Sequence, residues 1–277
     1  MRKPILYLFA AVIALLSFAS CASDDSADHG ALAGTGNMEL FFDHTFKGDK
    51  LILEVSSHTN SQMETLSISR FNYIISNISL IDDRGAVIDY PKEMGYFIVD
   101  SEKSQFTIQL KAIPSGNYKK IRFGLGVDQK RYLEGEQEQQ AFWDLAALHN
   151  MTWSWITGYK FINLEGVFRT ADSAEKREFK IHIGSHGKAL DNYRELELDF
   201  PSTARVRADL KPNVHFLVDG NLILDGIHKL KLTEALNPTG TTAVIMVSAE
   251  KAPKIMENAT KMFVIDHVHN DGQSHAN

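Results

Sequence analysis

Cysteine is almost absent from this chain of 277 residues, in which Cys21 is the only one. A single thiol cannot form a disulfide within the chain, and it cannot supply a zinc finger or an iron–sulfur cluster. If Cys21 carries a lipid, as argued below, the remaining chain has no thiol and a cysteine hydrolase is excluded as well. Any bound metal would then use histidine, methionine, carboxylate or backbone oxygen ligands.

The sequence also lacks a basic block, a second long apolar run and a recognisable catalytic motif. Its net charge of −6 argues against nucleic acid, which requires a concentrated positive patch. No stretch beyond the N-terminal run is long enough to cross a membrane. Gly124 and Gly126 precede Val-Asp rather than a helix start, and no convergent nucleophile, base and acid stand out, so we expect no enzyme.

The N-terminus has the order of a secretory signal. Arg2 and Lys3 precede an apolar run over residues 5–18, and small residues at 19 and 20 lead directly to Cys21. The sequence before Cys21 resembles a lipobox, with Phe18 where leucine is usual. We therefore predict a signal peptide over residues 1–20 and a lipid on Cys21. Ordinary signal cleavage near Ala22 is the alternative.

Residues 21–37 are small and polar and show no apolar periodicity, which predicts a flexible tether. A lipid on Cys21 would hold the protein at a membrane of the bacterial cell envelope. The side of the outer membrane, periplasmic or surface, is left open by this pattern.

From residue 38 the chain alternates apolar and polar positions in short segments separated by turns, which predicts strands. We expect a mainly β fold, a single sandwich-like or barrel-like domain over residues 38–277. Helical spacing indicates short helices at 134–148 and 251–263. The predicted strands are 38–46, 51–55, 69–80, 96–100, 106–110, 118–127, 153–155, 159–168, 178–183, 194–200, 206–209 and 214–218.

Five histidines are candidate metal ligands. His44 shares the apolar face of its predicted strand, where most histidines are hydrogen-bonded core residues. His182 points away from the apolar face of its strand, and His186 follows in a glycine-rich turn. His267 and His269 form a His-x-His pair, whose rings share one side of an extended segment.

Five motifs, in this order along the chain, resemble those of the MbnP-like family, and the resemblance spans residues 39–269. They are NYIISNISL at 72–80, YFIVD at 96–100, PSGNYKKIRFGLGVD at 114–128, MTWSWITGYKFINLEG at 151–166 and FKIHIG at 179–184. The resemblance implies a periplasmic or surface copper-binding protein related to MopE and CorA. In that group a tryptophan is oxidised to kynurenine, and in MbnP a partner di-haem peroxidase (MbnH-like) performs the oxidation.

Carried onto this chain, the resemblance makes Trp153 or Trp155 the tryptophan that is modified and His182 an imidazole ligand to copper. His44 also fits a position where family members often carry histidine. The MopE-like site resembles Trp-x-His, whereas this chain has Trp-x-Trp. One ligand would therefore come from elsewhere, and His44 and His267 are the replacements that their chemistry suggests.

The leading hypothesis is an envelope lipoprotein that captures, delivers or buffers copper. The alternative is a surface binding module that recognises a glycan, a peptide or an envelope protein through an aromatic face of Trp153, Trp155 and Tyr159. One structural observation distinguishes the two hypotheses. Joint exposure of the two tryptophans favours a binding face, whereas converging histidines favour a metal.

Overall fold

The computed structural model describes residues 32–270 of the chain. The predicted signal peptide over residues 1–20, the predicted lipid on Cys21 and most of the predicted tether lie outside these residues. Strand β1, Thr35–Phe46, begins within the tether predicted to end at residue 37, because Thr35 already pairs with Pro114. Within residues 32–270, no helix combines the length and the apolar character that a membrane span needs.

A five-stranded sheet is built around β1. Its order is β14 (Phe263–His269), β12 (Asn213–Asp219), β1 and β2 (Asp49–Lys50), and β7 (Thr107–Pro114) also pairs with β1. β1 and β12 are parallel, and the other pairs are antiparallel.

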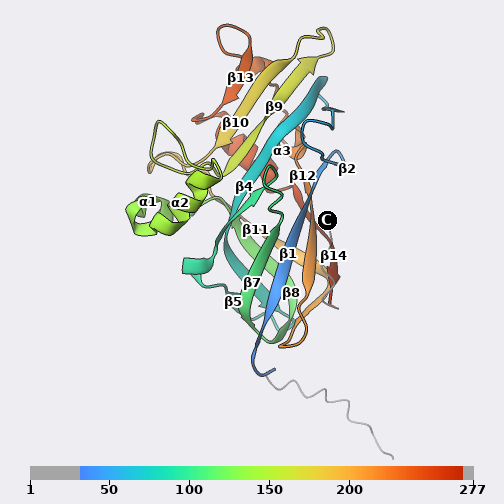
Figure 1. Ribbon diagram of the computed structural model, residues 1–277, viewed down its shortest axis with the longest axis vertical. Helices are drawn as coiled ribbons and strands as arrows, with labels where there is room; N and C mark the ends of the chain where they lie inside the picture. Colours follow the sequence, from blue (N-terminus) through green and yellow to red (C-terminus); the bar gives the residue numbers. More distant parts are fainter. Residues whose placement is uncertain (1–31, 271–277) are drawn as a thin grey trace, which may run out of the picture. The chain divides into compact units, whose positions relative to one another are not determined.

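A nine-stranded sheet forms the second layer, and its longest strand is β4 (Glu64–Asp82), which runs beside β9 in Figure 1. The order is β11 (Arg194–Val206), β8 (Gly116–Leu125), β4, β9 (Ile162–Thr170), β10 (Arg177–Ile183) and β13 (Thr242–Ile245). Three short strands also pair with β4: β3 (His58–Thr59), β5 (Val87–Asp89) and β6 (Tyr96–Asp100).

The core lies between the two sheets and is rich in aromatic rings. Phe42 of β1 stacks on Phe216 of β12, with ring centroids 4.7 Å apart. Phe123 of β8 meets Phe216 edge-on, and Tyr73 of β4 meets Phe263 of β14 in the same way. Such edge contacts add to the burial of apolar area, which is the main stabilising term. The expected mainly β, sandwich-like fold is confirmed.

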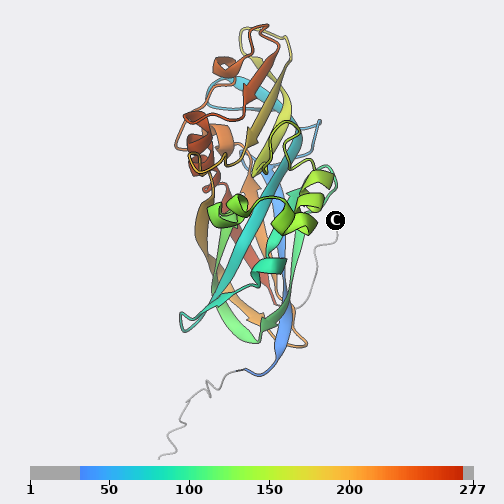
Figure 2. The ribbon, with the colours of Figure 1, turned by 90° about the vertical axis from the view of Figure 1, so that its left-hand side faces the viewer.

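Two helices cover part of the outer face of the nine-stranded sheet (Figure 2). They are α1 (Gln129–Glu134) and α2 (Gln140–Leu148), with the 3₁₀ turn η2 (Gln137–Gln139) between them. The predicted helix 134–148 is therefore interrupted, because Gly135 takes a positive φ of 86° that ends α1. Phe142 packs on Tyr96 and Tyr159, with ring centroids 5.2 and 5.3 Å apart, which holds α2 on the sheet.

The remaining short elements are η1 (Lys92–Met94), α3 (Leu222–Asp225), η3 (Thr233–Ala235) and α4 (Lys251–Ala259). The predicted helix 251–263 ends at Ala259 as α4, since Phe263 already starts β14. Predicted strand 206–209 is only the end of β11 at Val206.

Two predicted strands do not form. Residues 51–55 make a turn in which Glu54 has a positive φ of 61°. Residues 153–155 lie in a loop instead of a strand. Leu51 and Trp153 are buried without strand pairing, whereas Val55 and Trp155 are exposed, so the apolar alternation in these segments does not mark a strand face. Apart from 206–209, the other predicted strands are present, with ends shifted by a few residues.

Candidate metal centre

A row of polar residues crosses four strands of the nine-stranded sheet. Asp100 of β6 pairs with Asn72 of β4, Asn72 with Asn163 of β9, and Asn163 with His182 of β10. Neighbouring residues on a strand face opposite sides, and Tyr73, next to Asn72, faces the core between the sheets. The row therefore lies on the outer face, on the side that α2 covers.

His182 is held by a charged network on this face. Its Nε2–H donates to Glu165 Oε1 at 2.6 Å, and Arg70 binds the other oxygen of Glu165 at 2.9 Å. Arg70 also donates to both carboxylate oxygens of Glu102. A carboxylate that fixes one ring nitrogen of a histidine leaves the lone pair on the other nitrogen, Nδ1, which is the usual arrangement around a metal-binding imidazole.

The charges in this network favour a neutral imidazole beside an ionised carboxylate. Burial lowers the pKa of His182 and outweighs the opposing effect of Glu165. Burial would raise the pKa of Glu165, but the bonds from His182 and Arg70 outweigh it and hold the pKa at about 2. His182 therefore has a lone pair available at neutral pH, and Glu165 supplies a permanent negative charge next to it.

The loop that carries Trp153 closes over His182. The backbone N–H of Trp153 donates to the carbonyl of Gly158, and its indole Nε1–H donates to the carbonyl of Tyr159 at 3.2 Å. Gly184 follows β10 directly, and a Cβ there would lie 2.1 Å from that same Tyr159 carbonyl oxygen. The glycine of the His-x-Gly motif thus allows the loop to approach the end of β10 closely.

Trp153 lies beside two histidines. Its ring centroid is 5.9 Å from that of His182 and 5.5 Å from that of His186. Trp153 is only 5% exposed, whereas Trp155, whose centroid is 5.5 Å from Trp153, is 59% exposed. We call Trp153, His182, His186 and Glu165 the Trp153 site.

His186 carries the most informative feature of this site. Both of its ring nitrogens are buried, and within the described part of the chain neither makes a hydrogen bond. Burial lowers its pKa, which favours the neutral ring with a lone pair. Buried polar atoms normally have a partner, so an exception calls for an explanation, and a site built to bind an ion is one.

A lysine adds positive charge at the edge of the site. Lys160 donates to the carbonyl of Asn150 at 2.9 Å, and its ammonium lies 5.8 Å from the Trp153 ring centroid. Burial lowers the pKa of Lys160 and outweighs the attraction of Glu165.

His44 lies in another environment, between the two sheets. Ser101 donates its hydroxyl proton to the carbonyl of Phe71 and so accepts from His44 Nδ1, while Tyr73 donates to His44 Nε2; both bonds to the imidazole are 3.0 Å long. Burial lowers its pKa to about 3. His44 projects from the five-stranded sheet into the core, whereas His182 is on the outer face of the nine-stranded sheet, so the structure does not bring these two predicted ligands together.

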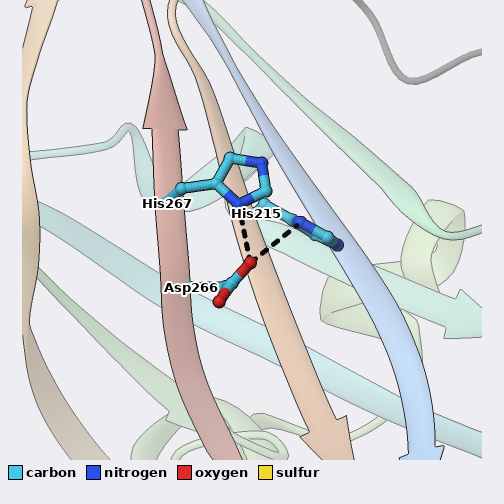
Figure 3. Close-up of side chains that lie close together, drawn as sticks. All are labelled: His215, Asp266 and His267. Atoms are coloured by element: carbon cyan, nitrogen blue, oxygen red, sulfur yellow. Dashed lines mark hydrogen bonds and ion pairs between the residues drawn. The ribbon is translucent and has the colours of Figure 1, made fainter.

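His267 and His269 are on β14, at the outer face of the five-stranded sheet, and their ring centroids are 4.5 Å apart. They do not join the Trp153 site. Instead, His267 meets Asp266 and His215, as Figure 3 shows. Two histidines therefore converge here, His215 and His267, with ring centroids 4.6 Å apart, and they lie away from the Trp153 site. Trp153 and Trp155 are not exposed together, which argues against an aromatic binding face.

Sequence reasoning missed two histidines. His149 is buried after α2 and binds Asp100 Oδ2 at 2.6 Å. His215 lies within predicted strand 214–218, and the alternation of Val214, Phe216 and Val218 could have placed it on the outer face. Its neighbours depend on which strand pairs with β12, which no local pattern reveals.

Comparison with known proteins identifies a family to which this chain is similar. A family model described as MbnP matches residues 35–246, well over half of the chain. MbnP from Methylosinus trichosporium has a similar structure, with a TM-score of 0.47 and 14% identity over 80% of this chain and 84% of that one. No curated protein sequence matches the chain. On the extent of the family match, this chain belongs to the MbnP family.

Proposed function

We propose that this protein binds copper at the Trp153 site, with the imidazoles of His182 and His186 as ligands. The observation that carries the proposal is His186, whose two buried nitrogens have no hydrogen-bond partner within residues 32–270 and lie against Trp153. Imidazole suits copper, and copper heads the affinity order of the divalent first-row metals. The residues present therefore fit the metal that the family resemblance implies.

Trp153, rather than Trp155, is the proposed site of oxidation. An intact indole offers only an N–H donor, which Tyr159 already accepts. Conversion to kynurenine by a partner di-haem peroxidase would supply an aromatic amine and a carbonyl beside the two imidazoles. The exposed ring of Trp155 lies against Trp153 and provides the adjacent surface for such a partner.

The biological role that we propose is capture, delivery or buffering of copper in the bacterial cell envelope, without catalysis. A lipid on Cys21 would tether the domain there. The charged network behind His182 is consistent with a storage or transfer site, because it holds the ligand in one orientation.

Copper titration of single-site variants tests this function. Protein from the native host, whose intact mass reports both the lipid on Cys21 and oxidation at Trp153, is titrated with Cu⁺ and Cu²⁺ separately. His182→Ala and His186→Ala should each weaken binding by at least about tenfold, since loss of a mere supporting group already costs about 10–100-fold.

His228→Ala is the matched control, because His228 also pairs with a glutamate, Glu257, at 2.7 Å, but on the surface near α4. It should leave the affinity unchanged. Wild-type affinity weaker than micromolar, or equal affinities for all three variants, would refute the proposal.

The network behind His182 gives a second prediction. Glu165→Gln keeps an oxygen that can accept from His182 but removes the charge that orients and polarises the imidazole. Copper affinity should fall about tenfold. Glu178→Gln is the control, since Glu178 also lies on this sheet but pairs with Lys180 at the surface. An equal loss in both variants would show a general effect of charge rather than support of His182.

The alternative of an aromatic binding face has less support. Of its three proposed residues, Trp153 and Tyr159 are buried, and only Trp155 is exposed. A single exposed tryptophan does not form the contiguous patch that such a face needs.

A further inference from the structure

A second group of metal-ligand side chains lies on the five-stranded sheet, away from the Trp153 site. Within residues 32–270, His215, Asp266 and His267 form the one group of three imidazole or carboxylate donors whose ligand atoms all lie within 4.8 Å of one another. We call it the His215 cluster. Asp266 and His267 lie beyond residues 35–246, so the family match does not account for it.

A β-bulge creates the cluster. His215 of β12 pairs with His267 of β14, but the next residue, Phe216, pairs with Ile265, which leaves Asp266 as an extra residue. In a regular strand Asp266 and His267 would face opposite sides. The bulge re-aims these two consecutive side chains so that both lie beside His215, and bulges commonly serve this purpose near functional sites.

The donors converge in the way a metal requires. Asp266 Oδ2 lies 2.7 Å from His267 Nδ1 and 3.9 Å from His215 Nδ1, so the carboxylate is between the two imidazoles (Figure 3). The ring centroids of His215 and His267 are 4.6 Å apart. Two ligand atoms that each lie about 2.0–2.2 Å from one metal ion are separated by distances of this order. Small side-chain rotations would therefore let the three ligand atoms of the cluster bind the same ion.

Further donors and an apolar wall surround the cluster. His269 lies beside His267 on the same face, and Asp43 Oδ2 of β1 is 3.8 Å from His215 Nε2. The Phe41 ring packs against the His215 ring, with ring centroids 5.2 Å apart, and so limits the rotation of the imidazole. His215 is buried, whereas Asp266 is exposed, so an ion could enter from solvent and be held by a fixed ring.

We propose that the His215 cluster binds a first-row divalent cation of the zinc and copper(II) class, independently of the Trp153 site. Two or three imidazoles with one carboxylate suit these borderline ions, whereas Mg²⁺ and Ca²⁺ prefer all-oxygen sites. An MbnP-family protein with this cluster would hold two metal ions, one on the outer face of each sheet.

Calorimetric titration of the metal-free full chain with Zn²⁺ tests the proposal. Asp266→Asn and His267→Gln should each lose one equivalent of Zn²⁺ relative to wild type, or bind that equivalent at least about tenfold more weakly. Both residues are partly exposed, so their replacement should leave thermal unfolding unchanged, and they are preferred to buried His215. Mg²⁺ should give no binding heat.

Matched controls separate this site from the Trp153 site. His228→Gln, a surface histidine paired with a carboxylate, should keep the full Zn²⁺ stoichiometry. Asp266→Asn should keep the copper-dependent quenching of tryptophan fluorescence, which His186→Ala should lose while retaining Zn²⁺ at the cluster. Unchanged Zn²⁺ binding in Asp266→Asn and His267→Gln, or an equal loss in His228→Gln, would overturn the proposal.

Discussion

Replacing Asp100 with alanine is expected to lower the free energy of unfolding by about 3 kcal/mol and to loosen the loop that carries Trp153. Asp100 and His149 are both almost completely buried and are joined at 2.6 Å. Removing the carboxylate leaves a buried imidazole N–H without an acceptor, and breaking such pairs is strongly destabilising. His149 ends α2 just before the loop, so its release should also change the environment of Trp153.

Urea unfolding followed by tryptophan fluorescence measures both effects. Asp100→Asn is the conservative control, because its amide oxygen can still accept from His149 and should preserve most of the stability. Glu257→Ala removes the carboxylate of the surface pair with His228 at a similar distance of 2.7 Å and should change stability little. Equal effects of Asp100→Ala and Glu257→Ala would contradict the role given to the buried pair.

The free energy of unfolding should fall steeply as the pH drops below about 6.5. Protonation of His44 in the unfolded chain should account for a large part of this fall. Its pKa is about 3 in the folded chain against an ordinary value of 6.5. Above pH 6.5 the ring is neutral in both states and contributes no pH dependence. Between pH 6.5 and 3 only the unfolded chain takes up the proton, which lowers the free energy of unfolding by about 1.4 kcal/mol per pH unit, roughly 5 kcal/mol in all.

The variant His44→Gln isolates this contribution. The glutamine can still accept a hydrogen bond from Tyr73 but does not titrate. Between about pH 6.5 and 5, where most carboxylates have not yet taken up protons, the pH slope of its unfolding free energy should be shallower than that of wild type by up to about 1.4 kcal/mol per unit. Identical slopes would mean that His44 is not the group that resists protonation.

The amino-acid sequence by itself determined the chemistry of the candidate ligands. Because Cys21 is the only cysteine, metal ligands in the described residues are restricted to imidazole, thioether, carboxylate and backbone groups. The family resemblance of the His-x-Gly and Met-x-Trp-x-Trp motifs pointed to His182 and to Trp153 or Trp155, and in the fold the ring of Trp153 lies beside that of His182. Strand alternation likewise predicted most of the β fold, because side-chain period and strand conformation are local properties.

The partners of each ligand were decided only by tertiary structure. Whether His44 or His186 joins His182 at Trp153 depends on which face of a sheet each residue occupies and on how a loop closes. Both follow from contacts far apart in sequence. His215 meets His267 only because β14 pairs with β12 and a bulge displaces Asp266. Strand pairing and bulge position arise from long-range packing. Residue types therefore determine which ligands are possible, and the tertiary structure determines which of them lie close together.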